Sequence, residues 1–412
     1  MEKLLQTVIF STLTFFSGLI PQAQFTEGVV GQPQSLNPIQ PTTNQVDRDL
    51  TSLIFQGLVK YDRQGSPVGV LAESWDISED EKDYTFHLRR NVSWHDGQLF
   101  NAEDVLYTVS QSSQLKGIQA DKLDDFTIRF RLKEPLASFL EIVTLGIIPA
   151  HLKGQDIALR PVGTGPFRVL KIKKSDKIEE ITLQGDGRRL AFKFYDSYAE
   201  LIAAAKLGDI DGYLLSEEEP KSEWPSFNYY SAAMQNRYYS ILFNLKSNLA
   251  LDNKELRQDL ARNLPKDKII QEALGDFGEV IEGPMDGTWA ENPDANILKY
   301  EPLNKKKYET TITLTVPRKP SNLKIAELIK NEWQTIGINL VLEVVDTDKL
   351  SDLILKSRNF QAVLLGQEVT HDPDRYTLWH SSQADPPGIN IAGIKQVRID
   401  RSLEEGRKVL DP

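Results

Sequence analysis

The second half of the chain alternates between two hydrophobic periods, and this alternation limits the possible folds more than any other feature. Residues 311–316, 338–345 and 361–365 are apolar runs with the length of strands, and residues 323–336 and 348–357 between them have helical spacing. Gly337 follows the first helix, where a left-handed residue commonly ends one. The resulting β-α-β-α-β order predicts a mostly parallel sheet with helices on its faces.

A shorter unit of the same kind occurs earlier in the chain. Residues 190–194 are predicted as a strand, residues 198–207 as a helix that ends at Gly208, and residues 210–215 as a further strand. Two α/β lobes are therefore expected. The aromatic and apolar residues 238–244 are predicted as a buried strand at the crossing between them. This division places lobe I at residues 26–240 and lobe II at residues 241–412, and we expect an error of several residues in the boundary.

Strand and helix signals also mark the middle of the first lobe. Large apolar residues alternate with polar ones over residues 84–89 and again over residues 126–132, as in half-buried strands. Between these segments, Asn101 is suited to cap a helix that has Asp104 at its third position. We therefore predict a strand, a helix and a second strand in this region.

Composition excludes several classes of function. The 59 acidic residues outnumber 48 basic ones, the formal charge is −11, and no long basic stretch is present. Nucleic acid is therefore not an expected partner, because binding the phosphate backbone requires clustered Lys and Arg. The absence of cysteine removes disulfides, thiolate metal sites, cysteine nucleophiles and lipid-modified cysteine.

The N-terminal segment predicts export. Lys3 precedes a mainly apolar run over residues 4–20, and the small residue Ala23 follows where a cleavage site could lie. Residues 1–25 are therefore expected to be a signal peptide. Several Ser and Thr residues interrupt the run, so a retained membrane anchor or a buried helix stays open as an alternative.

The segment LAESWDISEDEKDYTFHLRRNVSWHDGQLFNAEDVLYTV, residues 71–109, resembles the signature block of the family 5 bacterial extracellular solute-binding proteins. These are the dipeptide, oligopeptide and nickel receptors of ABC importers. Further matching motifs occur in the family's order: GQPQSLNP (31–38), IFQGLVKYDRQG (54–65), PVGTGPF (161–167), GDIDG (208–212) and HDPDRYTLWHSSQ (371–383). The resemblance extends from about Thr26 to the end of the chain.

The resemblance implies an α/β, two-lobed, periplasmic-binding-protein-like fold of type II, in the large peptide-receptor class, with a ligand cleft between the lobes. Lobe I would include an accessory subdomain at about residues 46–152. The implied function is that of an extracytoplasmic receptor that captures a peptide or another small molecule by lobe closure. Such a receptor is expected to be a monomer that delivers its ligand to an ABC permease and ATPase complex, without a cofactor and without catalytic residues.

Some ligand contacts can be carried over from the family. Gln32 and Pro33 would line the cleft, although they could equally form an ordinary turn. The remaining matches are Asn390, which corresponds to an asparagine that reaches peptide backbone in relatives, and Tyr238, Tyr239 and Asn244 near the expected hinge. Packing in the core is the alternative for both tyrosines.

The chain departs from peptide-binding relatives just before Asp372. Those relatives place an acid four residues before Pro373, where it pairs with the α-ammonium of the peptide. Val369 stands there in this chain. Glu368 is one residue earlier, and in an extended strand its side chain would point to the opposite face. Peptide specificity is therefore in doubt, even though the family is not.

Two histidine-containing segments suggest metal chemistry only weakly. His371, Asp372, Asp374 and His380 form a cluster, but the tight pairs of a typical metal site are missing, so no metal is expected. A lone His95 is more simply a hydrogen-bonded structural residue. The glycines of residues 163–166 lack the Lys and Ser or Thr of a phosphate-binding loop and predict a turn between strands.

Two other functions stay open as alternatives. The chain ends at Pro412, close to a helix predicted from Asp400, whereas the family returns to lobe I through a further segment. Lobe II is therefore expected to be truncated, and a sensory or scaffold domain without transport becomes more plausible. A carboxylate-pair hydrolase has only the abundance of acids in its favour, because no nucleophile elbow, zinc-protease helix or Cys/His pair is present.

Overall fold

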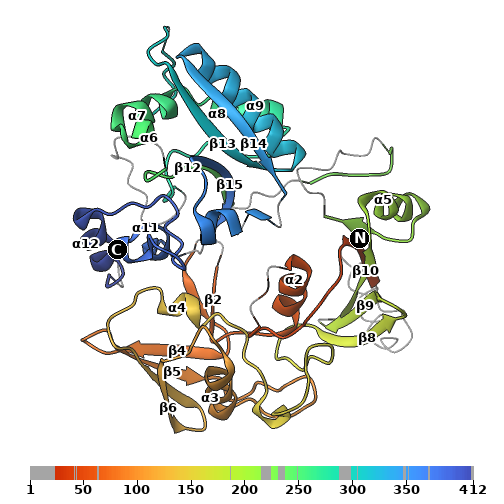
Figure 1. Ribbon diagram of the computed structural model, residues 1–412. Helices are drawn as coiled ribbons and strands as arrows, with labels where there is room; N and C mark the ends of the chain where they lie inside the picture. The colour runs from red at the N-terminus through yellow and green to blue at the C-terminus, as the bar shows by residue number, and fades with distance from the viewer. Residues whose placement is uncertain are drawn as a thin grey trace, which may run out of the picture.

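The chain folds into two lobes (Figure 1). The computed structural model describes residues 24–409 except 41, 43, 63–64, 186, 215–223, 231–236, 248, 287–297, 304, 347–348, 351 and 370–371. We use "lobe I" for residues 24–213 and "lobe II" for residues 237–409, because each set contains its own sheet. The predicted signal peptide, apart from Gln24 and Phe25, lies outside the described residues.

The main sheet of lobe I is mixed. Its strands, in spatial order, are β11 (Gly212–Tyr213), β1 (Gln24–Val30), β10 (Arg188–Tyr195), β9 (Ile178–Gly185) and β8 (Arg168–Lys174). β1 runs parallel to β10 and β11, whereas β8, β9 and β10 are antiparallel neighbours. The prediction of a mostly parallel sheet is therefore wrong here, because β8 to β10 follow one another through short turns. Helix α5 (Tyr198–Leu207) ends as predicted at Gly208, which has φ 76°.

The sheet of lobe II matches its prediction more closely. Its order is β12 (Arg237–Phe243), β15 (Ala362–Glu368), β13 (Thr310–Pro317) and β14 (Ile338–Val345), and α9 (Pro320–Thr335) connects β13 to β14. β13 is parallel to β14 and β15, and Gly337 has φ 94°. The helix predicted over residues 348–357 is a π-helix over Asp352–Ser357 where it is described.

The predicted crossing segment is strand β12, which pairs with β15 along its whole length. Only Leu242 among its residues is buried, since β12 lies at the edge of the sheet. Residues 237–240, which the sequence assigns to lobe I, are thus part of the sheet of lobe II.

The accessory region of lobe I has its own sheet, in the order β4 (Ala72–Ile77), β5 (Asp83–Leu88), β7 (Thr127–Arg131) and β6 (Gln119–Asp124). Alternate residues of β5 are buried, as predicted. Helix α3 (Ala102–Gln111) begins with a reciprocal capping box between Asn101 and Asp104, which satisfies two free amides. A small hairpin joins β2 (Val59–Tyr61) to β3 (Pro67–Gly69).

The remaining helices are short. They are α2 (Gln45–Ile54), α4 (Phe139–Ile142), η1 (Ala150–Leu152), α6 (Leu249–Asp252), α7 (Lys254–Arg262), α8 (Lys266–Ala273), α11 (Tyr376–Trp379), η3 (Ser381–Gln383) and α12 (Val397–Gly406). Within the described ranges, no helix has both the length and the apolar character needed to cross a membrane.

His95 ties the accessory region to the turn that leads into β8. Its Nδ1 accepts the amide hydrogen of Gly163 at 3.2 Å, and its Nε2 bonds the carbonyl oxygen of Gly165 at 2.9 Å. A Cβ on Gly163 would lie 1.9 Å from the carbonyl oxygen of Ile54, so only glycine fits there. The predicted structural role of His95 is confirmed, whereas residues 163–166 form a bend between η1 and β8 and not a turn between two strands.

Candidate functional site

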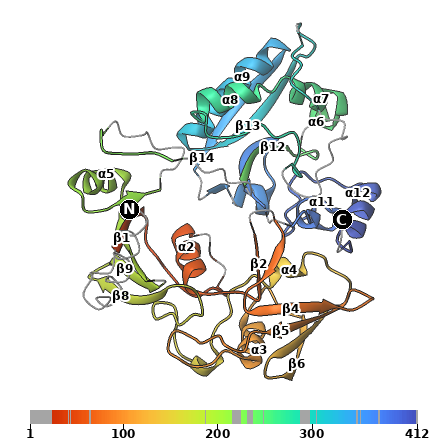
Figure 2. The same cartoon turned by 180° about the vertical axis from the view of Figure 1, so that it is seen from behind.

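The two lobes meet first at helix α2. Glu368 at the end of β15 lies 3.6 Å from the guanidinium of Arg48 on α2 and 3.6 Å from that of Arg237 on β12. Arg237 also donates to Gln45 Oε1 at 3.0 Å. Figure 2 shows α2 between the sheets of the two lobes, as does Figure 1. Glu368 therefore faces α2, and its contacts join lobe II to lobe I.

A second contact joins the segment before α4 to the C-terminal helices. The amide of Ala137 donates to the carbonyl of Arg407 at 2.7 Å, and Ser138 donates to Asp374 at 3.2 Å. Arg407 in turn donates to Asp374 at 2.9 Å, and its guanidinium lies 4.3 Å from the ring centre of Tyr376. This contact places residues 372–376 of lobe II directly against lobe I.

A half-buried acid of lobe I, Glu141, and a buried acid of lobe II, Asp372, lie together at this second contact. The backbone amide of Asp372 hydrogen bonds to Glu141 on α4. Burial, and after it the charge of the nearby Asp372 carboxyl, together raise the pKa of the Glu141 carboxyl to about 7. Burial also raises the pKa of Asp372 and that of the Tyr61 hydroxyl. Glu141 therefore gains or loses its proton close to neutral pH.

Several buried donors beside this cluster have no hydrogen-bond partner in the part of the chain that the structure describes. Arg375 is only 3% exposed, and although Nη1 donates to the carbonyl of Asp372 at 2.7 Å, Nε and Nη2 are unpartnered. The Tyr238 hydroxyl and the Trp379 Nε1 are also buried and unpartnered. Buried polar groups are nearly always satisfied in folded proteins, so this concentration indicates a place for a ligand or water.

Gln32 and Pro33 lie next to the start of α2. The Gln32 carbonyl accepts a hydrogen bond from Asn44 Nδ2 at 2.8 Å, and Asn44 also caps α2 by accepting from the Val46 amide. Pro33 is buried. The Gln32 side-chain nitrogen is buried without a partner among the described residues. Gln32 thus retains a spare donor near the first contact between the lobes.

Other predicted contact residues have structural partners. Tyr239 packs against the apolar core under α9. Asn244 donates to the carbonyls of Arg358 and Phe360 at 3.0 and 3.1 Å. These partners favour the packing alternative for Tyr239 and a loop-fixing role for Asn244.

The side chain of Asn390 makes its hydrogen bonds to backbone groups of lobe II, one of them the carbonyl of Trp379. Asn390 is fully buried, its Nδ2 donates to the carbonyls of Trp379, His380 and Ile394, and its Oδ1 accepts from Gly393 and Ile394. Both ends of the amide are therefore occupied within the loop. Val369 is half-buried next to the end of β15, and His371 lies outside the described residues.

The residues that sequence reasoning missed are Tyr61, Glu141 and Arg375. Arg375 falls inside the motif of residues 371–383, but an arginine before a short helix gives no sign in sequence that it will be buried. His380 bonds Ser382 Oγ at 2.8 Å and Glu404 at 3.2 Å. No group of three potential metal ligands occurs among the residues that the structure describes.

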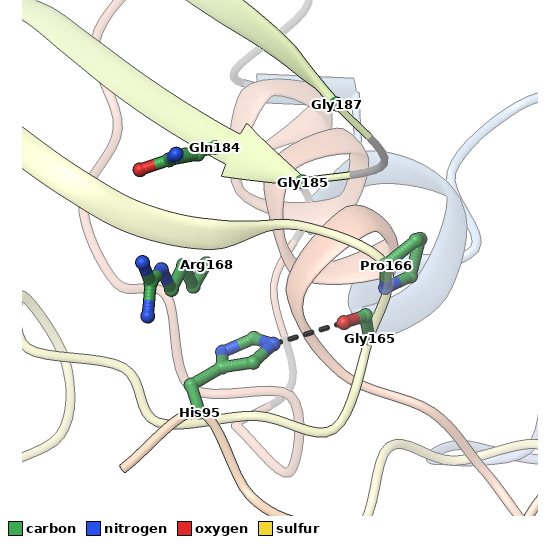
Figure 3. Close-up of a pocket in the computed structure, with 7 residues that line it drawn as sticks. All are labelled: His95, Gly165, Pro166, Arg168, Gln184, Gly185 and Gly187. Carbon is green, nitrogen blue, oxygen red and sulfur yellow. Dashed lines mark hydrogen bonds between the residues drawn. The ribbon is translucent and has the colours of Figure 1, made fainter. Parts of the chain in front are cut away.

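Two cavities lie away from the contact between the lobes. One, of about 310 Å³, is bordered by His95 and Arg168 in lobe I (Figure 3), and the other, of about 240 Å³, is bordered by Asn244 and Arg358 in lobe II. In Figure 3 the His95 ring points toward Gly165, and its Nε2 is hydrogen bonded to the Gly165 carbonyl oxygen. The first cavity is thus bordered by His95 and by the bend that leads into β8.

A two-lobed α/β chain with spare buried donors where its lobes meet has the construction of a solute-binding protein. Residues 66–387 match the model of the bacterial extracellular solute-binding proteins, family 5 Middle. The chain belongs to this family, whose members act outside the cytoplasm.

Curated relatives match nearly the whole chain. The oligopeptide-binding protein AppA of Bacillus subtilis is 24% identical over 93% of this chain and 80% of its own length. The di/tripeptide-binding protein 1 of Pseudomonas aeruginosa is 25% identical over 95% of this chain and 85% of its own length. Both relatives are binding proteins.

Solved structures share the fold. The ABC transporter substrate-binding protein CtaP of Listeria monocytogenes matches with a TM-score of 0.77 and 23% identity, over 94% of this chain and 87% of its own. NikZ of Campylobacter jejuni, in complex with Ni(L-His), matches with a TM-score of 0.73 and 23% identity, over 95% and 87%. The predicted two-lobed fold class is confirmed.

Proposed function

We propose that this chain captures peptides between its lobes outside the cytoplasm and delivers them to an ABC permease and its ATPase. The names of the relatives AppA and di/tripeptide-binding protein 1 support peptides as the ligand class. The observation that carries a binding function is a set of buried polar atoms near the contact between the lobes, from Gln32 to Arg375, that have no partner in the described part of the chain. A ligand enclosed there would satisfy them and would bring the lobes together.

The proposal assigns roles to the predicted regions. Lobe I, with its accessory region at about residues 46–152, holds Gln32 and Pro33 at one wall. Lobe II contributes Tyr238, Glu368, Val369 and Asp372 at the other. The protein works as a monomer, performs no bond chemistry and needs no cofactor. The segment of residues 1–25 directs export, either as a cleaved signal or as an anchor.

Isothermal titration tests the proposal. Purified protein is titrated with Ala-Ala, Ala-Ala-Ala and Ala-Ala-Ala-Ala, with maltotriose as a solute that lacks peptide groups. We expect binding of at least one peptide and a more compact particle in small-angle scattering when it is bound. Gln32→Ala should weaken binding, whereas Gln184→Ala, at the remote cavity of Figure 3, should not. Folded protein that binds none of these peptides at 1 mM, roughly the weakest affinity expected of a receptor, would contradict peptide capture.

A further inference from the structure

We propose that Arg375, Tyr238 and Trp379 form an anion subsite that anchors a carboxylate group of the ligand. This inference rests on the proposed binding function and specifies its chemistry. All three residues belong to lobe II, and each has at least one buried donor without a partner among the described residues.

The three side chains come from two neighbouring elements. Arg375 immediately precedes α11, and the amide of Trp379 donates to the carbonyl of Arg375 at 3.1 Å, so the two residues are one helical turn apart. Residues at this separation lie on the same side of a helix. Tyr238 lies on β12, and its hydroxyl is close enough to interact electrostatically with the Arg375 guanidinium. The side chain of Trp379 also packs against the apolar cluster that contains Leu242 of β12, so the three residues lie where α11 meets β12.

A second arginine nearby shows how a purely structural arginine is held. Arg407 donates through Nε to the Asp374 carboxylate at 2.9 Å and stacks on Tyr376, while about a third of its side chain stays exposed. Arg375 is far more buried, yet no acid lies within 4 Å of its guanidinium in the described part of the chain. A buried cation without a partner destabilises the folded protein, so we infer that the ligand supplies the partner.

The charges around Arg375 leave room for such a partner. Asp374 is bound by Arg407 and Ser138. Asp372 Oδ1 accepts from the Asp374 amide at 2.7 Å, and the Asp372 carbonyl takes the Nη1 hydrogen of Arg375. Both carboxylates act on Arg375 electrostatically without an ion pair at bonding distance. Nε and Nη2 remain as two adjacent donors.

The spare groups also determine the class of the ligand. Guanidinium and indole N–H groups only donate, and a phenol hydroxyl can donate as well, so the occupant must offer several acceptor atoms. Two adjacent guanidinium donors fit the two oxygens of a carboxylate in a bidentate arrangement. The subsite therefore orients a ligand by its carboxylate instead of its ammonium group.

Paired peptides test the inference. Ala-Ala-Ala-Ala, its C-terminal amide and its N-acetyl form are titrated into the wild type, Arg375→Gln and Arg358→Gln. Arg358 is a matched control. It too has nitrogens without a partner among the described residues, but it borders the separate cavity of lobe II, next to Asn244. We expect the free acid to bind about 10- to 150-fold more tightly than the amide, which is the range for a charge-assisted hydrogen bond. Arg375→Gln should abolish this preference, and N-acetylation should change affinity little.

A preference for the acid that survives in Arg375→Gln would overturn the inference. So would equal binding of the acid and the amide to the wild type. These outcomes leave peptide binding itself intact and therefore separate the inference from the proposed function.

Thermal unfolding tests the subsite without any peptide. Arg375→Gln removes an unpaired buried charge, so the melting temperature of the ligand-free protein should stay unchanged or rise, whereas a structural arginine would lower it by more than about 4 °C. Sodium acetate at constant ionic strength should raise the melting temperature of the wild type by about 2 °C and leave that of Arg375→Gln unchanged. If no peptide binds, peptide capture fails and the acetate result decides the subsite: equal shifts in both proteins would reject it.

Discussion

The accessory region around β5 and the contact between the lobes both contain almost fully buried side chains, but the polar atoms of these side chains differ in their partners. Around β5, the rings of Tyr84, Phe86, Phe130 and Phe139 are at most 1% exposed, and the Tyr84 hydroxyl donates to the Leu136 carbonyl at 3.2 Å. At the lobe contact, Arg375 is 3% exposed, and two of its nitrogens have no partner among the described residues. The hydroxyl of the aromatic core is thus satisfied within the protein, whereas the lobe contact offers donors for the ligand that we propose.

The largest expected effect comes from the aromatic core. Phe86→Ala removes a fully buried ring that contacts Phe130 edge-on at 5.7 Å between centroids, and should lower the free energy of unfolding by about 3–5 kcal/mol. Guanidinium denaturation followed by circular dichroism measures it. Leu123→Ala, at a half-exposed site, is the control and should cost under about 0.5 kcal/mol. A loss below about 1 kcal/mol for Phe86→Ala would break the comparison.

A smaller effect, on the order of 1 kcal/mol after allowance for solvent screening, is expected from Glu141. Its pKa is raised from 4.5 to about 7, so the folded state holds a proton that the unfolded state releases. Stability should therefore fall as pH rises from about 4.5 to 7, and stay low above that range. Glu141→Gln should remove this dependence, as melting temperatures between pH 4.5 and 8 would show. A wild-type stability that increases over this interval while the variant stays flat would contradict the assignment.

Two tyrosines sharpen the comparison further. Tyr84→Phe removes a hydroxyl that has a partner and should cost about 1 kcal/mol. Tyr238→Phe removes a hydroxyl that has no partner among the described residues, and should leave the stability of the ligand-free protein unchanged or slightly increased. Thermal melts of the two variants, run in parallel with the wild type, measure the change in melting temperature. Equal destabilisation would show that Tyr238 has an unrecognised structural role.

The smallest expected effect is at the exposed contact of α2. Arg48→Ala removes a partner of Glu368 at 3.6 Å, where both side chains are more than a third exposed, so stability should change by under about 0.5 kcal/mol. Small-angle scattering at low and high salt should instead show a shift toward separated lobes at low salt. A profile identical to the wild type at both salt concentrations would remove Glu368 from the contacts that hold the lobes together.

Local chemistry determined which parts of the fold could be predicted. Strand β14 was predicted residue for residue, and α3 was recognised from Asn101 and Asp104, because both depend on periodicity and a cap within a few residues. The mixed sheet of lobe I escaped prediction, since pairing of β1 with β10 joins residues far apart in the chain.

The site was harder to predict for the same reason. Glu141 and Asp372 are brought together only when the lobes fold against each other, and no spacing in sequence records it. Asn390 is the opposite case. The resemblance to the family predicts a ligand contact there, whereas the Asn390 side chain makes its hydrogen bonds within its own loop.

The hydrogen bonds from His95 to Gly163 and Gly165 affect the conditions under which this protein can fold. One imidazole joins residues that are about 70 positions apart, which is the task that a disulfide often performs in exported proteins, and this chain contains no cysteine. A hydrogen-bonded ring forms as soon as its neighbours fold and requires neither an oxidant nor a disulfide isomerase. These hydrogen bonds therefore do not depend on the redox state of the surroundings. They depend on pH instead, because a second proton on the His95 ring would displace the amide of Gly163.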